Sequence, residues 1–581
     1  MNNKNDMDYY LLTSLGVRPQ DGRYKLENRI ESGNFSSSAL VKLLEQKPKK
    51  VFVLLTSKAR EKSLEEFQKE IGLETEIIDI PDGVNDEEIK TIIRKILMVI
   101  PEGSNLILDI SQGFRHFPFL FFTSVLYLQS FRGVNIHKIY YGMYEKIPEY
   151  GFSPIIELGS ILEMVEWYHS VKDFSEMKLS GNLAKMIDNK LNDRSLNRIS
   201  KDFIEKITIQ IKRFDDFYGT GLPMGIGDSS KSLINQFKNN ETKLKNGSKE
   251  IIPLGGELFK FATKSLEDFK LVDSISTSGK WKEKFKLDYT ELERQCRIID
   301  SFFTTGHYVN AIRLMREWII SRCTLSSDIT NGWLKRSKRA PVERLLGSIR
   351  WQAEKGILVD DKKELASIWD SISKYRNEIA HNGMNEERID ISRNLDRIEK
   401  IWKRMKELMH DDKYWDLKIG GEGGKLLITP FGFSKGLLYS AIKLINPDNC
   451  IIITSKEAAS SIPEIMKKAG YIGNYELIDI IDPHTGYNEI KDIINTLIPN
   501  RAGIFLDADE IIINLTGGTT TLQVLVDVIS HKCWEMGKDP NKVIILDKRD
   551  AQEQRDNPYV TGEIIYLEDI ISCSKKDGED D

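Results

Sequence analysis

The chain has 581 residues, which predicts three or four domains at about 150 residues each. Its 83 Lys and Arg residues nearly balance its 88 Asp and Glu residues, and the formal charge of −5 excludes a uniformly basic nucleic-acid coat or a polybasic membrane binder. Hydrophobic residues make up 40% and charged residues 29% of the sequence, which excludes a disordered or collagen-like protein.

No membrane partner is expected, because the longest apolar run, Phe117 to Leu128, is too short to cross a bilayer. The N-terminus lacks the basic and apolar regions of a secretory signal, so we predict a cytoplasmic protein. The cysteines are far apart in the sequence and match neither a disulfide framework nor zinc-ligand spacing, so we expect reduced thiols and no metal site. They are Cys296, Cys323, Cys450, Cys533 and Cys573.

An N-terminal domain is predicted over residues 1–161. Short apolar runs alternate there with longer amphipathic ones, which favours a parallel sheet covered by helices and a Rossmann-like fold. The runs are YYLLTSLG, VFVLLT, TEIIDI, DEEIKTIIRKILMVI, NLILDIS, FLFFTSVLYLQSF and HKIYYGM.

The middle of the chain reads as helices. Residues 162–289 form a predicted helical connector, in which the glycine and polar content of 219–231 and 239–247 indicates loops. Residues 290–413 carry a dense helical pattern and form a predicted all-α domain.

A second α/β domain is predicted over residues 425–572, where strand and helix patterns alternate again. Residues 414–424 precede it as a linker, since Gly420–Gly424 is too rich in glycine for a helix or a packed strand. Residues 573–581 form an acidic tail that we expect to be disordered. The two α/β domains are predicted to share an architecture, without an obvious repeat at residue level.

The sharpest local motif, YRNEIAHNG, ends a helical pattern that begins near Asp361. Asn377 and His381 are four apart and share a helix face, and Arg376 lies beside it with the reach to converge. Histidine is suited to moving a proton near neutral pH, and arginine stabilises charge developing on a phosphoryl group. The alternative from geometry alone is an ordinary helix end with an incidental arginine and a capping histidine.

The loops after the first and fourth predicted strands of each α/β domain are candidate anion-binding sites, because ligands bind beyond the carboxyl ends of such strands. The N-terminal candidates are Gly16, Arg18, Ser111, Gln112, Gly113 and Arg115. The C-terminal candidates are Ser434, Lys435, Asn514, Thr516, Gly517, Gly518 and Thr519. The alternative is that the glycines only permit tight turns. Neither domain has the GxGxxG or GxxxxGK[ST] pattern, which argues against a Rossmann dehydrogenase.

These motifs resemble those of CRISPR-associated CARF–HEPN ribonucleases of type III systems. Arg376, Asn377 and His381 match the HEPN motif RxxxxH, LILDISQGFRHFPFL resembles the CARF motif DxTHG, and NLTGGTT is similar to a loop of other CARF domains. The match to DxTHG departs from that pattern, with Ser111 and Gln112 in place of Thr and His.

The resemblance implies a homodimer without cofactors that cuts single-stranded RNA without a metal when cyclic tetra- or hexa-adenylate binds. By this resemblance Arg376 and His381 are catalytic and Asn377 is supporting. The C-terminal CARF-like domain is an addition to the usual layout.

Our further hypothesis is that Ser434, Lys435 and Thr516 bind the ring and cleave it, because a ring carries its own 2′-OH nucleophiles. The alternative function is a nucleotide-sensing regulator or scaffold whose HEPN helices only dimerise. The cluster Lys335, Arg336, Lys338 and Arg339 is interpreted either as a contact for RNA phosphates or as a solvated charged loop.

Overall fold

A computed structural model covers the chain. It describes residues 8–192, 196, 198–240, 252, 254–272, 285–327, 331–358, 360–380, 391–417 and 423–573. The chain divides into two compact units. The first contains Met1–Phe174, Lys185–Lys201 and Asn240–Ala262, and the second contains Ser175–Ala184, Asp202–Asn239 and Thr263–Asp581.

The first unit contains a sheet with the order β3-β2-β8-β7-β6-β1-β4-β5. The strands are β1 (Tyr9–Ser14), β2 (Gly22–Leu26), β3 (Arg29–Gly33), β4 (Lys50–Leu55), β5 (Thr75–Asp79), β6 (Asn105–Asp109), β7 (Asn135–Gly142) and β8 (Ser153–Glu157). The helices are α1 (Ser36–Leu43), α2 (Ser57–Ile71), α3 (Asp86–Val99), α4 (Phe117–Arg132), the short 3-10 turn η1 (Tyr144–Lys146) and α5 (Ile147–Tyr150).

The central strands of this sheet are apolar on both faces because helices cover both. Leu11 packs with α1 and α2, whereas its neighbour Leu12 packs with α3 and α4. Strands β5-β4-β1-β6-β7 are parallel, and β8 runs antiparallel to β7. The direction of the strand order reverses between β1 and β6, which opens a crevice at their carboxyl ends.

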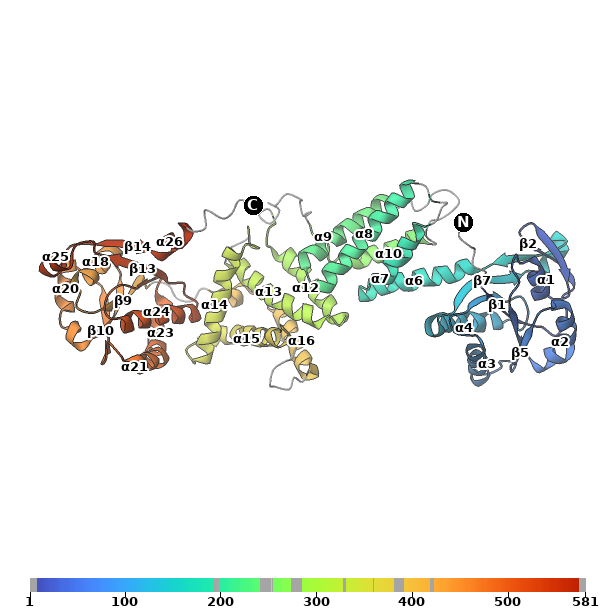
Figure 1. Cartoon of the computed structure of the whole chain (residues 1–581), viewed down its shortest axis with the longest axis horizontal. Helices are drawn as coiled ribbons and strands as arrows, with labels where there is room; N and C mark the ends of the chain where they lie inside the picture. The colour runs from blue at the N-terminus through green and yellow to red at the C-terminus, as the bar shows by residue number, and fades with distance from the viewer. Residues whose placement is uncertain are drawn as a thin grey trace. The chain divides into compact units, whose positions relative to one another are not determined.

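The second unit contains a sheet with the order β11-β10-β9-β12-β13-β14, in which only the edge strand β14 is antiparallel (Figure 1). The strands are β9 (Lys425–Phe431), β10 (Asn449–Ser455), β11 (Asn474–Ile480), β12 (Glu510–Asn514), β13 (Asn541–Leu546) and β14 (Glu563–Tyr566). The helices are α18 (Lys435–Ile445), α19 (Lys456–Ala459), α20 (Ile462–Ala469), α21 (Tyr487–Asp492), the π-helical turn η3 (Ile493–Leu497), α22 (Ile498–Asn500), α23 (Ala502–Asp507), α24 (Thr520–Glu535), α25 (Ala551–Asp556) and α26 (Leu567–Cys573).

This order matches β5-β4-β1-β6-β7-β8 of the first sheet strand for strand. Its apolar residues also alternate between two cores, since Ile428 packs with α24 and Leu427 packs with α18 and α20. The predicted α/β regions at both ends of a helical middle are confirmed at this level. The hairpin β2–β3, which the sequence did not predict, is an addition to the first sheet.

Helices occupy the middle of the chain. They are α6 (Gly159–Met177), α7 (Gly181–Lys190), α8 (Arg198–Thr220), α9 (Pro223–Asn240), α10 (Gly255–Leu266), α12 (Tyr289–Thr304), α13 (Tyr308–Ser326), α14 (Arg336–Glu354), α15 (Asp360–Ala380), α16 (Ile391–Glu407) and α17 (Asp412–Trp415). The buried ring of Trp318 forms a centre of packing, with its centroid 5.8 Å from that of Trp402 and 5.4 Å from that of Trp415.

The predicted loop over 219–231 is wrong, because α9 begins at Pro223. Its glycines permit close packing rather than a loop. A Cβ on Gly225 would lie 2.3 Å from the Phe217 ring, and one on Gly227 would lie 2.6 Å from the Leu271 side chain. In the second predicted loop, Asn239 and Asn240 belong to α9, and residues 241–247 lie outside the described residues.

The predicted linker over 414–424 begins too early. Trp415 and Leu417 are buried in the helical core, because α17 returns the chain to Trp318. Residues 418–422 and 574–581 lie outside the described residues. Cys296, Cys323, Cys450 and Cys533 are free and buried. Within the described parts of the chain, no helix has the length and apolar character needed to cross a membrane.

Candidate functional site

The N-terminal crevice is organised around Asp109, a fully buried carboxylate at the end of β6. Asp109 pairs in register with Thr13 of β1 and accepts hydrogen bonds from the hydroxyls of Thr13 (3.2 Å), Ser36 (3.1 Å) and Ser111, and from the Ser111 amide (3.1 Å). The Ser111 hydroxyl in turn accepts from the amide of Gly142 at 2.8 Å. Burial raises the pKa of Asp109, and the donors, Ser111 first, oppose that shift.

The predicted residues of this crevice differ in exposure: Gln112 is buried, Gly16 and Ser111 are half-buried, and Gly113, Arg18 and Arg115 are exposed. The loops that carry Gly16 and Gly113 meet where β1 and β6 end. The Gln112 side chain is 5% exposed, its Nε2 donates to Gln20 Oε1 at 3.3 Å, and its buried Oε1 has no partner among the described residues.

A small cavity of about 110 Å³ lies between the two loops. Its lining includes Gly16 and Val17 after β1, and Gly113 and Phe114 after β6. Gly113 has φ +104°, and a Cβ there would lie 2.7 Å from the Phe117 ring and 2.8 Å from Ser14 Oγ. Glycine is therefore required for the β6 loop to approach β1 this closely.

The C-terminal crevice repeats this arrangement with an amide in place of the carboxylate. Asn514, at the end of β12, donates from Nδ2 to Thr429 Oγ1 and to the Thr516 carbonyl, both at 2.9 Å. Its Oδ1 accepts from the Thr516 amide at 3.0 Å. The Thr516 hydroxyl accepts from the Ile545 amide at 2.9 Å, just as Ser111 accepts from Gly142.

The glycines of the C-terminal crevice also have N-terminal counterparts. A Cβ on Gly432 would lie 2.9 Å from the Cα of Gly518, so the two loops touch as those of Gly16 and Gly113 do. Gly517 and Gly518 have φ values of +115° and +67°. A Cβ on Gly518 would lie 2.7 Å from the Leu522 side chain, four residues on, as one on Gly113 would from Phe117.

A third loop, after β11, belongs to the C-terminal crevice and was not predicted. The hydroxyl of Thr519 donates to the Pro483 carbonyl, and that of Thr521 donates to the His484 carbonyl at 2.9 Å. Asp482 holds this loop in a turn by accepting from the amides of His484 and Thr485, both at 3.0 Å. The hydrogen bonds of Asp482, first those from Thr485, lower its pKa.

Ser434 and Lys435 stand at the opening of the C-terminal crevice, where α18 begins. Ser434 is exposed and its hydroxyl does not cap the helix. Lys435 Nζ lies 3.0 Å from Glu464 Oε2, and this hydrogen bond raises the lysine pKa. Lys435 is therefore a cation at neutral pH, held at the crevice by a carboxylate that an anionic ligand would have to replace.

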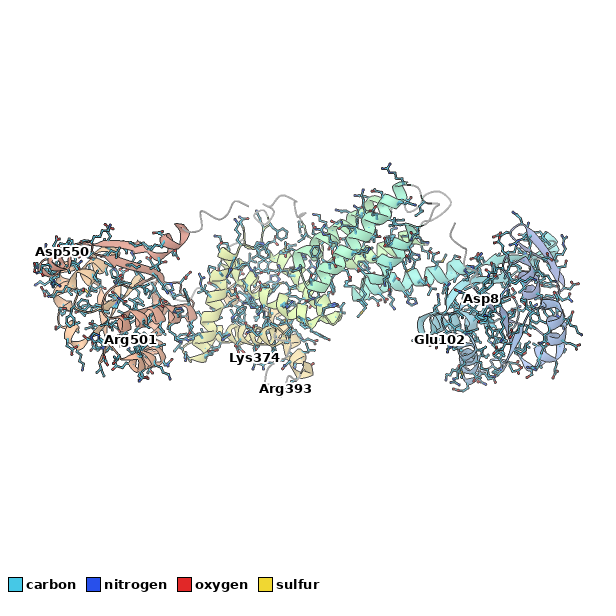
Figure 2. All side chains as sticks on the ribbon, viewed as in Figure 1. Asp8, Glu102, Lys374, Arg393, Arg501 and Asp550 are labelled. Atoms are coloured by element: carbon cyan, nitrogen blue, oxygen red, sulfur yellow. The ribbon has the colours of Figure 1, made fainter. Side chains whose placement is uncertain are left out.

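The helical candidate site lies at the end of α15. Arg376 and Asn377 are exposed, and Arg376 Nη1 donates to Asn377 Oδ1 at 3.2 Å. His381 lies outside the described residues, which end at Ala380. Lys374 precedes the pair on α15, and Arg393 comes from the neighbouring helix α16 (Figure 2).

The basic cluster Lys335–Arg339 is not a loop but the start of α14. Arg339 donates to Ser321 and lies 2.7 Å from Glu317, whereas Arg336 and Lys338 are exposed. Helix α14 packs against α15, where Arg350 and Asp370 approach to 3.5 Å.

Thr13, Ser36, Asp109 and Thr429 are site residues that the sequence reasoning missed. One signal was available: TSLG at 13–16 and TPFG at 429–432 both end a first strand, and DISQG and NLTGG both follow the fourth. The expectation of no repeat at residue level is therefore wrong at the crevices. The hydroxyls of Thr13, Ser36 and Thr429 form hydrogen bonds within the crevices, and such bonds leave no other recognisable pattern in the sequence.

Part of this chain is similar to a CRISPR-associated protein. No family model matches the sequence. The chain is similar to the CRISPR-associated protein MJ1674 of Methanocaldococcus jannaschii, with 27% identity over 137 residues. The match covers 23% of this chain and 20% of that protein, so it spans about a fifth of the relative's length.

Proposed function

We propose that this chain is an endoribonuclease of CRISPR defence that cuts single-stranded RNA without a metal when a cyclic oligoadenylate binds. The observation that carries the proposal is the exposed pair Arg376 and Asn377 near the end of α15, five and four residues before His381 in the sequence. The similarity to a CRISPR-associated protein supports the biological setting.

The chemistry follows from the residue types. The 2′-oxygen of a ribose attacks the adjacent phosphorus, the bond from phosphorus to the 5′-oxygen breaks, and a 2′,3′-cyclic phosphate forms. One imidazole takes the proton of the 2′-OH, and an imidazolium gives a proton to the leaving 5′-oxygen. Arg376 stabilises the negative charge on the phosphoryl oxygens, and Asn377 holds its guanidinium through their hydrogen bond.

This mechanism requires a homodimer, because one chain supplies a single His381 and only part of an enclosure for the ring. Two proton transfers need two histidines, and the motif provides one His381 per chain. The N-terminal cavity of about 110 Å³ is also smaller than the roughly 300–1,000 Å³ of ordinary ligand pockets, so it encloses too little of a ring of four or six nucleotides. A second copy placed across this crevice would complete the enclosure.

The two crevices suit a phosphate-bearing ligand, because each combines loop amides, hydroxyls and a nearby cation at the carboxyl ends of parallel strands. In the C-terminal crevice, Lys435 and the exposed hydroxyl of Ser434 stand at the opening, and Thr516 lies in the loop beyond them. This arrangement supports slow cleavage of the bound ring by one of its own 2′-hydroxyls. Turnover of cyclic tetra- and hexa-adenylate, followed by mass spectrometry, tests that activity separately from RNA cleavage.

RNA cleavage by the full chain tests the main proposal. An unstructured RNA is incubated with each cyclic oligoadenylate, with and without EDTA. Cleavage that requires a ring and survives EDTA is expected. Ring binding without RNA cleavage would instead favour a sensor or scaffold in which the helices only pair.

A further inference from the structure

We propose that occupancy of the C-terminal crevice is transmitted to Arg376 through two helices in series, α24 and α14. This inference deepens the proposed function and rests on it: it assigns control of the nuclease to the C-terminal crevice.

Helix α24 spans the distance from the crevice to the helical bundle. It begins at Thr520, directly after the loop Gly517–Thr519, and ends at Glu535. Sixteen residues of α-helix extend about 24 Å, so a shift of the loop at one end moves the other end as a rigid rod. Its first turn is also tied to the loop after β11 through Thr521.

The far end of α24 is locked onto α14. The Ser348 hydroxyl donates to the Met536 carbonyl and accepts from Gln352 Nε2 at 3.1 Å. Gly537 has φ +80°, and a Cβ there would lie 2.5 Å from Ser348 Cβ and 3.0 Å from the Arg344 carbonyl. The backbone that follows α24 therefore lies directly against α14, with no space for a side chain at Gly537.

Two further contacts strengthen this junction. Arg344 and Asp539 form an ion pair of 2.9 Å, and Trp351 packs on the core between α24 and the C-terminal sheet. Polar, charged and apolar contacts thus fix α14 to the C-terminal domain over more than two helical turns.

Helix α14 then continues the path to the candidate nuclease site. It packs along α15, where Arg350 and Asp370 lie 3.5 Å apart, and Arg376 follows Asp370 by six residues. A ligand that binds one position of α24 more tightly than another therefore shifts the preferred position of α14. It thereby also shifts the preferred position of Arg376 and Asn377 on α15.

Gly537→Ala tests the junction in the full chain. The added Cβ is expected to lower ring-stimulated RNA cleavage at least tenfold, while a labelled cyclic oligoadenylate binds within threefold of wild type. Gly470→Ala is the matched control, since Gly470 has φ +68° but a Cβ there would meet no atom within 4 Å, and this variant should be activated like wild type. Normal activation of Gly537→Ala would overturn the inference.

A crevice variant tests whether the C-terminal domain is in control. Ser434→Ala/Lys435→Ala should lose ring-stimulated cleavage. Undiminished ring-stimulated cleavage by this variant would refute the inference.

Hydrogen exchange separates failure of the inference from failure of the proposed function. Cyclic tetra- or hexa-adenylate should change the protection of α14 amides in wild type and much less in Gly537→Ala. A wild-type protein that shows this change but never cleaves RNA refutes the proposed nuclease and leaves the coupling intact. Cleavage without any change in α14 refutes the coupling alone.

Discussion

The N-terminal and C-terminal crevices use the same backbone arrangement with opposite hydrogen-bonding roles. Asp109 and Asn514 both end the fourth parallel strand, and each reaches a threonine on the first strand, Thr13 or Thr429. A carboxylate only accepts, so Asp109 requires donors, including Ser36 from the N-terminus of α1. Asn514 donates and accepts, and needs no such helper.

The comparison also explains how the two loops differ in available space. Gln112 lies three residues after Asp109, and its side chain is buried beside Gln20. Gly517 holds the matching position after Asn514 and leaves the backbone bare. A close approach of phosphate to loop amides is therefore easier in the C-terminal crevice, which agrees with the control we propose for it.

The largest expected effect lies outside both crevices. Arg376→Lys replaces a planar fork of donors with a point charge and should lower single-turnover RNA cleavage about 100-fold or more, with ring binding unchanged. Lys374→Ala, on the same helix, is the control and should reduce cleavage less than threefold. Equal losses in both variants would indicate general electrostatics instead of a specific arginine.

Exchanging the side chains of Asp109 and Asn514 tests most directly whether the two crevices differ in their hydrogen-bonding roles. Asn514→Asp places a carboxylate oxygen against the Thr516 carbonyl, where Nδ2 now donates, and should cost about 3 kcal/mol of unfolding free energy. Asp109→Asn keeps the shape, and its hydroxyl neighbours can rotate, so about 1 kcal/mol is expected. Denaturant unfolding measures both, and a larger cost for Asp109→Asn would contradict the assigned roles.

Substitution of a glycine in either crevice is expected to have a smaller effect on stability, of similar size in the two crevices. Gly113→Ala and Gly518→Ala both place a side chain in the left-handed region and 2.7 Å from an apolar neighbour, so each should cost about 1–3 kcal/mol. Gly113→Ala should cost more, because Ser14 Oγ also lies 2.8 Å away. Thermal unfolding of the two variants checks the order, and the reverse order would contradict the packing described for the β6 loop.

The titration of Asp109 makes the free energy of unfolding depend on pH, whereas Asn514 in the C-terminal crevice has no such titration. Burial raises its pKa above the ordinary 3.8, so the folded state holds the proton more tightly than the unfolded chain. Wild type should therefore lose stability relative to Asp109→Asn as the pH rises through the interval between these two pKa values. Unfolding of both proteins from about pH 4 to pH 7 measures the difference, and parallel curves would contradict a raised pKa.

The smallest effect on stability is expected for Ser111 and Thr516, which lie two residues after Asp109 and Asn514. Ser111→Ala and Thr516→Val each leave one backbone amide, that of Gly142 or Ile545, without its acceptor, at a cost of about 1–2 kcal/mol. Ser111→Ala should cost more, since Asp109 also loses a donor. A smaller cost for Ser111→Ala, measured by denaturant unfolding, would mean that its bond to Asp109 contributes little.

The fold was largely predictable because its strands are buried on both faces. Runs such as VFVLLT and CIIITS leave little ambiguity between strand and surface helix, and they located both sheets. The error over 219–231 has a physical cause: Gly225 and Gly227 are glycines because Phe217 and Leu271 press on the helix, and the sequence alone does not reveal such contacts.

The candidate sites were predictable only in part. Loop residues such as Ser111 and Thr516 were found because strand ends collect ligands. Ser36 and the loop of Asp482 come from distant segments, and only the folded chain brings them to the crevices. The Arg376 motif was found from its spacing, but its relation to α24 depends on the packing of Gly537 against α14.

One measurement tests the central claim most directly: the rate at which wild type and His381→Ala cut an unstructured RNA in EDTA with saturating cyclic tetra- or hexa-adenylate. The account predicts cleavage by wild type that ends in a 2′,3′-cyclic phosphate and none by the variant, with equal ring binding by both. Intact RNA with the wild-type protein and every ring, or undiminished cleavage by His381→Ala, would contradict it.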